Sequence, residues 1–146
     1  MSALFEHSPW VEARADAHPT SGDRHADLMA VVRDASAEEQ LALIRAHPEL
    51  AGKAAIDGTL TQASAAEQAS AGLDRMTDEE FERFHTLNAA YREKFGFPFI
   101  ICVRLTDKPG ILAAMQARLE NEREQEIAAA LEQIGEIVRL RLEDAA

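Results

Sequence analysis

The sequence lacks the residues on which several common classes of protein depend. Its single cysteine, Cys102, excludes an intramolecular disulfide and any multi-cysteine metal site. There is no HExxH motif, and no two histidines have the helical spacing of a metal site. No apolar run approaches the roughly 20 residues that a membrane-spanning helix needs. We therefore expect neither a metal centre nor a membrane protein.

Positive charge is also scarce. The chain has 15 Lys and Arg against 26 Asp and Glu, a formal net charge of -11. An acidic surface repels phosphate backbones, so we expect no nucleic-acid partner, and an anionic ligand would need local cations or backbone N–H groups. The start MSALFEHSPW lacks the basic and apolar regions of a signal peptide, and the end LEDAA is not a peroxisomal signal. These features favour a cytoplasmic protein.

What the sequence does contain favours helix. It is rich in Ala, Leu and Glu, and only 5% of its 146 residues are aromatic. This length suits one domain that spans residues 1–146. We predict an all-α fold, a compact single-domain bundle of about seven or eight helices. One extended apolar segment, Phe97–Val103, would lie near its centre.

Local signals predict where helices begin. Ser8 and Pro9 are typical of a helix start, with Ser8 as the cap and Pro9 at the first helical position. Apolar spacing predicts helices over Arg24–Asp34 and about Glu122–Leu142. Capping-box patterns, in which Ser or Thr is followed three residues later by Glu, predict further starts. They lie at Ser36–Glu39, Ser64–Glu67 and Thr77–Glu80.

The stretch Leu87–Val103, LNAAYREKFGFPFIICV, holds three of the six Phe and the only Tyr and Cys. It has the pattern of a helix end, a stop at Gly96, and an apolar run too short for a buried helix. A buried extended segment leaves backbone N–H and C=O groups in need of partners. We expect those groups to bind either neighbouring helices or a ligand.

Two short motifs have both a structural and a chemical interpretation. His47 precedes Pro48 at a predicted helix end. An imidazole ring titrates near neutral pH, so it suits acid–base chemistry. The simpler interpretation is that the histidine complements the dipole at the helix end. The run SAAEQ at Ser64–Gln68 is either a plain cap or a helix N-terminus that holds a polar ligand. Arg139 and Arg141 are most simply interpreted as a solvated face of the last helix.

Several motifs together are more specific than any one of them. They are HPELAGK at His47–Lys53, SAAEQASAGL at Ser64–Leu73, LNAAYREKFGFPFIICV at Leu87–Val103, the opening FEHSPW at Phe5–Trp10, and Glu126, Ala130–Glu132 and Arg139–Leu142 in the last helix. In this order and spacing they resemble the OHCU decarboxylases (OHCU is 2-oxo-4-hydroxy-4-carboxy-5-ureidoimidazoline), enzymes of urate breakdown. The resemblance covers nearly the whole chain, and Ala15–Ala35 contributes little to it.

The resemblance implies an all-helical, cofactor-free homodimer that converts OHCU into (S)-allantoin. It implies that His47 is the catalytic acid–base residue and that Glu67 is a carboxylate working beside it. It also implies a substrate pocket and no metal ligand. The implied substrate-binding residues are Pro48, Ser64, Ala65, Ala66, Glu67, Gln68, Phe99, Ile100, Ile101, Cys102 and Val103.

Two other functions are consistent with the sequence. One is a helical binding module without catalysis, in which the Phe-rich run is core and SAAEQ is a cap. The other is a related enzyme that acts on a different ureido-imidazoline. The sequence also leaves open whether Cys102 acts through its thiol or only through its backbone.

Overall fold

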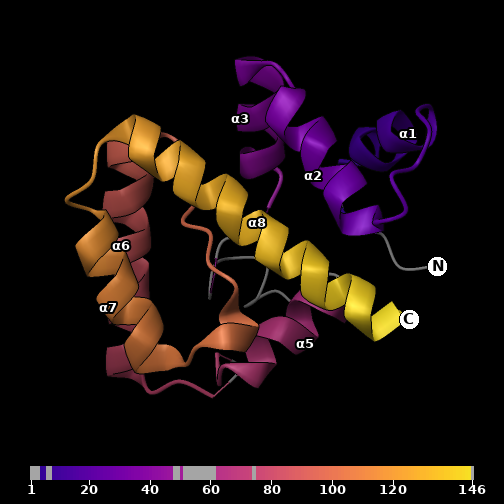
Figure 1. Cartoon of the computed structure of the whole chain (residues 1–146). Coiled ribbons are helices and arrows are strands. Elements are labelled where there is room, and N and C mark those ends of the chain that lie inside the picture. Colours follow the sequence, from indigo (N-terminus) through magenta and orange to yellow (C-terminus); the bar gives the residue numbers. More distant parts are fainter. Residues whose placement is uncertain (1–3, 6–7, 48–49, 51–61, 74, 146) are drawn as a thin grey trace.

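The computed structural model describes residues 4–5, 8–47, 50, 62–73 and 75–145, and this part of the chain is helical without any strand. The predicted all-α fold is confirmed. Figure 1 shows the arrangement of the helices. They are α1 (Trp10–Asp16), α2 (Arg24–Asp34), α3 (Ala37–Arg45), α5 (Gln62–Ser70), α6 (Asp78–Phe95), the short 3₁₀ helix η1 (Val103–Leu105), α7 (Lys108–Arg118) and α8 (Arg123–Ala145).

Several helices begin where local chemistry predicts. At α3 the Ser36 side chain accepts the N–H of Glu39, whose carboxylate in turn accepts the N–H of Ser36. Thr77 and Glu80 form the same reciprocal pair at α6. These two of the three predicted capping boxes are therefore confirmed. Each satisfies two backbone donors that lack a partner inside the helix.

Two predicted helix starts are wrong. Helix α5 begins at Gln62, so Ser64 lies inside the helix rather than at its cap, and no Ser64–Glu67 capping box forms. Helix α1 begins at Trp10, with Pro9 rather than Ser8 at the cap position and no side-chain cap. In both cases a serine near a helix start takes part in packing instead, since Ser8 and Ser64 are both buried.

Helix α8 spans the molecule and contacts elements from distant parts of the sequence. Figure 1 shows it crossing the whole protein diagonally, with α2 and α3 to one side and the pair α6 and α7 to the other. Its buried stripe includes Ala130, Ile134 and Val138, spaced four residues apart. The C-terminal part of α8 comes close to α5, since Arg141 of α8 is hydrogen-bonded to Glu67 of α5.

The stretch after α6 follows the predicted pattern, with one difference. The helix ends at Phe95, and Gly96 has φ 82°, a left-handed conformation that glycine adopts at little cost. Residues 98–102 are non-helical, and Phe97, Phe99 and Ile100 are buried. Val103, predicted to end the extended segment, instead begins η1. The apolar side chains of this segment thus belong to the core, as predicted.

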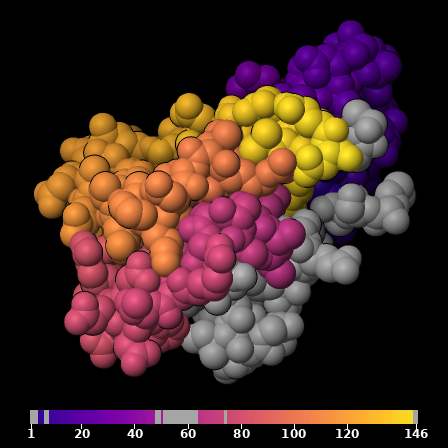
Figure 2. All heavy atoms as spheres, turned by 90° about the horizontal axis from the view of Figure 1, so that it is seen from below, coloured from indigo at the N-terminus to yellow at the C-terminus, as the bar shows by residue number. Residues whose placement is uncertain are grey.

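One face of the protein combines elements that are far apart in sequence. Figure 2 shows α5 at this face, flanked by the residues of the α7 region and by the C-terminal end of α8. Helix α5 also packs against η1. Among the described residues, no helix is both long and apolar enough to cross a membrane. Residues of α5, η1 and α8 also line the pocket described next.

Candidate active site

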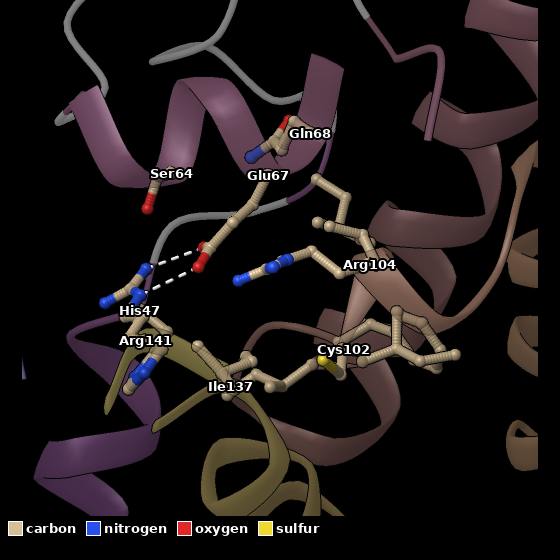
Figure 3. A pocket seen from close by; sticks show the side chains of 13 residues that line it. His47, Ser64, Glu67, Gln68, Cys102, Arg104, Ile137 and Arg141 are labelled. Atoms are coloured by element: carbon tan, nitrogen blue, oxygen red, sulfur yellow. Dashed lines mark hydrogen bonds and ion pairs between the residues drawn. The ribbon is translucent and has the colours of Figure 1, made fainter. Parts of the chain in front are cut away.

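A pocket lies between α5, the segment after α6, η1 and the C-terminal half of α8 (Figure 3). It is partly open, and it contains about 450 Å³ of space between atoms when its opening to solvent is included. The residues that line it come from four separate parts of the sequence. They are His47, Leu50, Ser64, Glu67, Gln68, Phe99, Ile100, Ile101, Cys102, Val103, Arg104, Ile137 and Arg141.

Helix α5 presents its polar side to the interior. Ser64, Glu67 and Gln68 are spaced by three and four residues, so they share one face of the helix, and all three line the pocket. Ser64 and Gln68 are buried, whereas Ala65 and Ala66 are exposed. An ordinary amphipathic helix has the opposite arrangement. Polar side chains on a buried face need partners, and a pocket for a polar ligand provides them.

The Glu67 carboxylate is held by Arg141 of α8. Arg141 donates from Nε to Glu67 Oε2 at 2.8 Å and from Nη2 to Oε1 at 2.7 Å, and from Nη1 to the Leu4 carbonyl at 3.2 Å. The two side chains are only 9% and 13% exposed. Figure 3 shows this pair at one side of the pocket. The pair fixes the direction of the carboxylate.

Arg141 was missed by the sequence interpretation, which placed it on a solvated face. A signal for it does exist in the sequence. Arg141 follows Ile134 and Val138 at steps of four and three, so it continues the buried stripe of α8. A charged residue on such a stripe is expected to have a buried partner. The partner itself, 74 residues earlier in the chain, has no local signature.

His47 lies just beyond the end of α3. Its Nδ1 is 2.9 Å from the carbonyl oxygen of Leu43. A carbonyl oxygen only accepts, so Nδ1 carries a proton and donates it. In the neutral ring the lone pair is then on Nε2, which becomes the atom that can gain and lose a proton. The ring lines the same pocket as Glu67 and Arg141.

The segment Phe99–Val103 forms the opposite wall of the pocket. Its backbone is held in place by side chains of later helices. The Cys102 N–H donates to Gln133 Oε1 of α8 at 2.9 Å, and the Ile100 carbonyl accepts from Arg118 Nη1 of α7 at 2.7 Å. Burial raises the pKa of the Cys102 thiol, so this group is held in its neutral form. Neighbouring helices thus satisfy at least these two backbone groups.

A buried polar network supports the wall from behind. The fully buried Glu126 accepts from Arg118 Nε at 2.8 Å and from the Tyr91 hydroxyl at 2.5 Å. It also accepts from Asn121 Nδ2 at 2.8 Å. The Arg118 guanidinium carbon lies 4.4 Å from the centre of the Phe99 ring. Burial, followed by the hydrogen bond to Glu126, raises the pKa of Tyr91. Arg118 therefore connects an internal carboxylate to the pocket wall.

The structure brings together most residues predicted for the site. His47, Ser64, Glu67, Gln68 and Phe99–Val103 all line the pocket. Ala65 and Ala66 do not line it, and Pro48 lies outside the described residues. Leu50, Arg104, Ile137 and Arg141 line the pocket without having been predicted to do so. Within the part of the chain that is described, no three His, Cys, Asp or Glu side chains are grouped as a metal site would require.

The described part of the chain is all-helical, and one pocket brings together a histidine, a carboxylate and two arginines. The chain belongs to the OHCU decarboxylase family, whose family model matches residues 1–143. This places it among the decarboxylases, which are carboxy-lyases. The resemblance inferred from the sequence motifs is confirmed.

Individual relatives agree with this membership. The chain is 42% identical to 2-oxo-4-hydroxy-4-carboxy-5-ureidoimidazoline decarboxylase of Haloferax volcanii, over 95% of this chain and 82% of that protein. It is also 42% identical to the uric acid degradation bifunctional protein PucL of Bacillus subtilis, over 99% of this chain and 29% of that protein. The crystal structure of an (S)-allantoin synthase superposes with a TM-score of 0.70 and 34% identity. That match covers 97% of this chain and 46% of the solved one.

Proposed function

We propose that this protein decarboxylates OHCU stereoselectively to (S)-allantoin in urate degradation. Family membership and the names of the relatives support the reaction and its pathway. The observation that carries the proposal is the gathering of His47, Glu67 and Arg141 around one pocket. A proton donor, an oriented carboxylate and a guanidinium suit a small anionic substrate with several polar groups.

The substrate's own structure makes this reaction possible with acid–base groups. Loss of carbon dioxide leaves an electron pair on the ring carbon that carried the carboxylate. An adjacent ring C=N accepts that pair, so the substrate provides the electron sink that a cofactor supplies in other decarboxylases. The protein must then hold the ring in one orientation and deliver one proton to one face. Delivery to a single face decides the handedness of the product.

We assign the proton transfer to His47. The Leu43 carbonyl accepts the hydrogen bond from Nδ1–H, so we assign the proton transfer to Nε2. His47 either removes the proton of the ring hydroxyl or, after carbon dioxide is lost, protonates the former C=N carbon while the hydroxyl-bearing carbon becomes a carbonyl. General acid–base assistance of this kind is worth roughly 10²–10⁴-fold in rate. Since Leu43 already orients the ring, we assign Glu67 to the substrate hydroxyl rather than to orienting His47.

The remaining pocket residues bind the substrate in this proposal. Ser64 and Gln68 present a hydroxyl and an amide from the polar face of α5, which suits the ureido group and the ring amide. Within Phe99–Val103, backbone N–H groups other than that of Cys102, which binds Gln133, donate to the charge that develops on the ring oxygens. A contact of the substrate with Pro48 belongs to the same proposal. So do the homodimer, cofactor independence, the cytoplasmic location and a single domain over residues 1–146.

The test is the optical activity of the product. OHCU is generated from urate in place, the purified protein is added, and the rotation of the allantoin formed is followed. The uncatalysed decay gives a racemate, so the proposal requires a faster reaction and an optically active product. Racemic allantoin at the spontaneous rate would indicate a binding module or an enzyme for another ureido-imidazoline.

A further inference from the structure

A second arginine reaches the pocket, and its ion pair differs from that of Arg141. Arg104 lies in η1 and lines the pocket. Figure 3 shows its side chain extending into the pocket toward the region of Glu67. Its Nη1 donates to Asp144 Oδ2 at 2.7 Å and its Nη2 to Oδ1 at 3.3 Å. Asp144 lies near the end of α8, outside the set of residues that line the pocket.

The two arginines are held to different degrees. Arg141 and Glu67 are 9% and 13% exposed, whereas Arg104 and Asp144 are 30% and 61% exposed. Breaking an inner pair leaves a desolvated charge, while an exposed pair is exchanged with little net change in free energy. Arg141 is also bound to the Leu4 carbonyl. Arg104 is thus the arginine of this pocket that can change its partner more readily.

The charge balance of the pocket points to the same residue. The inner pair of Glu67 and Arg141 is neutral as a unit, so Arg104 supplies the additional positive charge among the lining residues. The whole chain carries a formal net charge of -11, which opposes the approach of any anion. An anionic substrate needs a local cation at the opening of the pocket. A guanidinium matches a carboxylate with two parallel donors.

We propose that Arg104 binds the carboxylate of the substrate and exchanges Asp144 for it when the substrate enters. This inference rests on the proposed function, because it requires a substrate that carries a carboxylate. The exchange replaces one carboxylate partner by another, so no ion pair is lost. Once carbon dioxide has formed, the product has no carboxylate and Arg104 returns to Asp144. The contact therefore serves capture of the substrate and release of the product.

The experiment compares Arg104→Gln, Asp144→Asn and the control Arg139→Gln in turnover of freshly generated OHCU. Arg104→Gln is expected to raise KM about tenfold, the size of one lost charge-assisted contact, with kcat nearly unchanged. Asp144→Asn removes the competing carboxylate and is expected to lower KM. Arg139→Gln makes the same change of net charge on an exposed part of α8 and is expected to alter neither value.

Inhibition by allantoin separates a carboxylate contact from general damage. Allantoin lacks the carboxylate, so its inhibition constant is expected to be the same in wild type and Arg104→Gln. Equal losses of allantoin binding and of OHCU turnover would show that Arg104 only supports the fold, and would overturn the inference. An unchanged KM in both Arg104→Gln and Asp144→Asn would overturn it too. Absence of turnover in the wild type would overturn the proposed function and this inference together.

Discussion

Arg141 of α8 binds both oxygens of Glu67 of α5, at 2.8 and 2.7 Å, across 74 residues of sequence. The pair has two consequences. It joins the last helix to the helix that carries the polar face of the pocket, and it sets the direction of the carboxylate proposed to contact the substrate. These two effects can be separated by experiment.

We expect Arg141→Met to destabilise the fold by about 3 kcal/mol or more, since it leaves a largely buried carboxylate without its cation. The double variant Glu67→Met with Arg141→Met is expected to recover much of that stability, because apolar residues can replace a buried pair. Turnover is expected to remain lost in both. Denaturant unfolding and OHCU turnover are the measurements. A double variant that recovered turnover with stability would show that the pair is only structural.

Replacement of His47 by Gln is expected to slow turnover by roughly 10²–10⁴-fold. The residual product is expected to approach a racemate, because the uncatalysed decay then competes with the enzyme. The measurement is the optical rotation of allantoin together with the rate. His85→Gln is a matched control, since His85 is exposed on α6 and does not line the pocket. Optically pure product at the wild-type rate from His47→Gln would contradict the proposed role.

The Arg118–Glu126 pair is expected to matter for stability far more than a surface pair. Glu126→Gln leaves the charge of Arg118 without its buried carboxylate and is expected to destabilise by about 3 kcal/mol or more. Arg139→Gln, which breaks exposed pairs with Glu136 and Glu143, is expected to change stability by less than about 1 kcal/mol. Chemical denaturation measures both. If Glu126→Gln and Arg139→Gln lowered the free energy of unfolding by similar amounts, the buried network would not stabilise the fold more than a surface pair does.

Acid is expected to weaken the contact between α1 and α3. Hydrogen bonds from the Arg14 side chain and then the Ser36 backbone lower the pKa of Glu39 from 4.5 to about 2. A carboxyl with a lowered pKa in the folded state stabilises the fold above its unfolded pKa, and the contribution disappears as the pH falls through the folded pKa. We therefore expect wild type to melt above Glu39→Gln at neutral pH, with the difference shrinking below about pH 4.5 and vanishing near pH 2.

The control for this prediction is Glu38→Gln, on the same first turn of α3 but without the capping and Arg14 bonds described for Glu39. Its melting temperature relative to wild type is expected to change little over the same range. A difference between wild type and Glu39→Gln that stayed constant from pH 7 to about pH 2 would contradict the assignment.

The features that the sequence alone predicted correctly depend on residues close together in the chain. The capping boxes of Ser36 and Thr77 are three-residue patterns, and the helix stop at Gly96 needs one residue that tolerates positive φ. The same pattern at Ser64 was misleading. The tendency of serine to cap a helix competes with packing. Here the helix begins at Gln62, before Ser64, and Ser64 is buried at the pocket.

The amino-acid sequence by itself determined an all-helical chain, its membership of the OHCU decarboxylase family, and the positions of His47 and Glu67 within recognisable motifs. Only the tertiary structure decided that Arg141 turns inward to Glu67, that Arg118 supports the pocket wall, and that Arg104 reaches the pocket. The physical reason is the range of the interactions. Helix propensity and capping act within a few residues, whereas partners from α5, η1 and α8 meet only after the chain has folded.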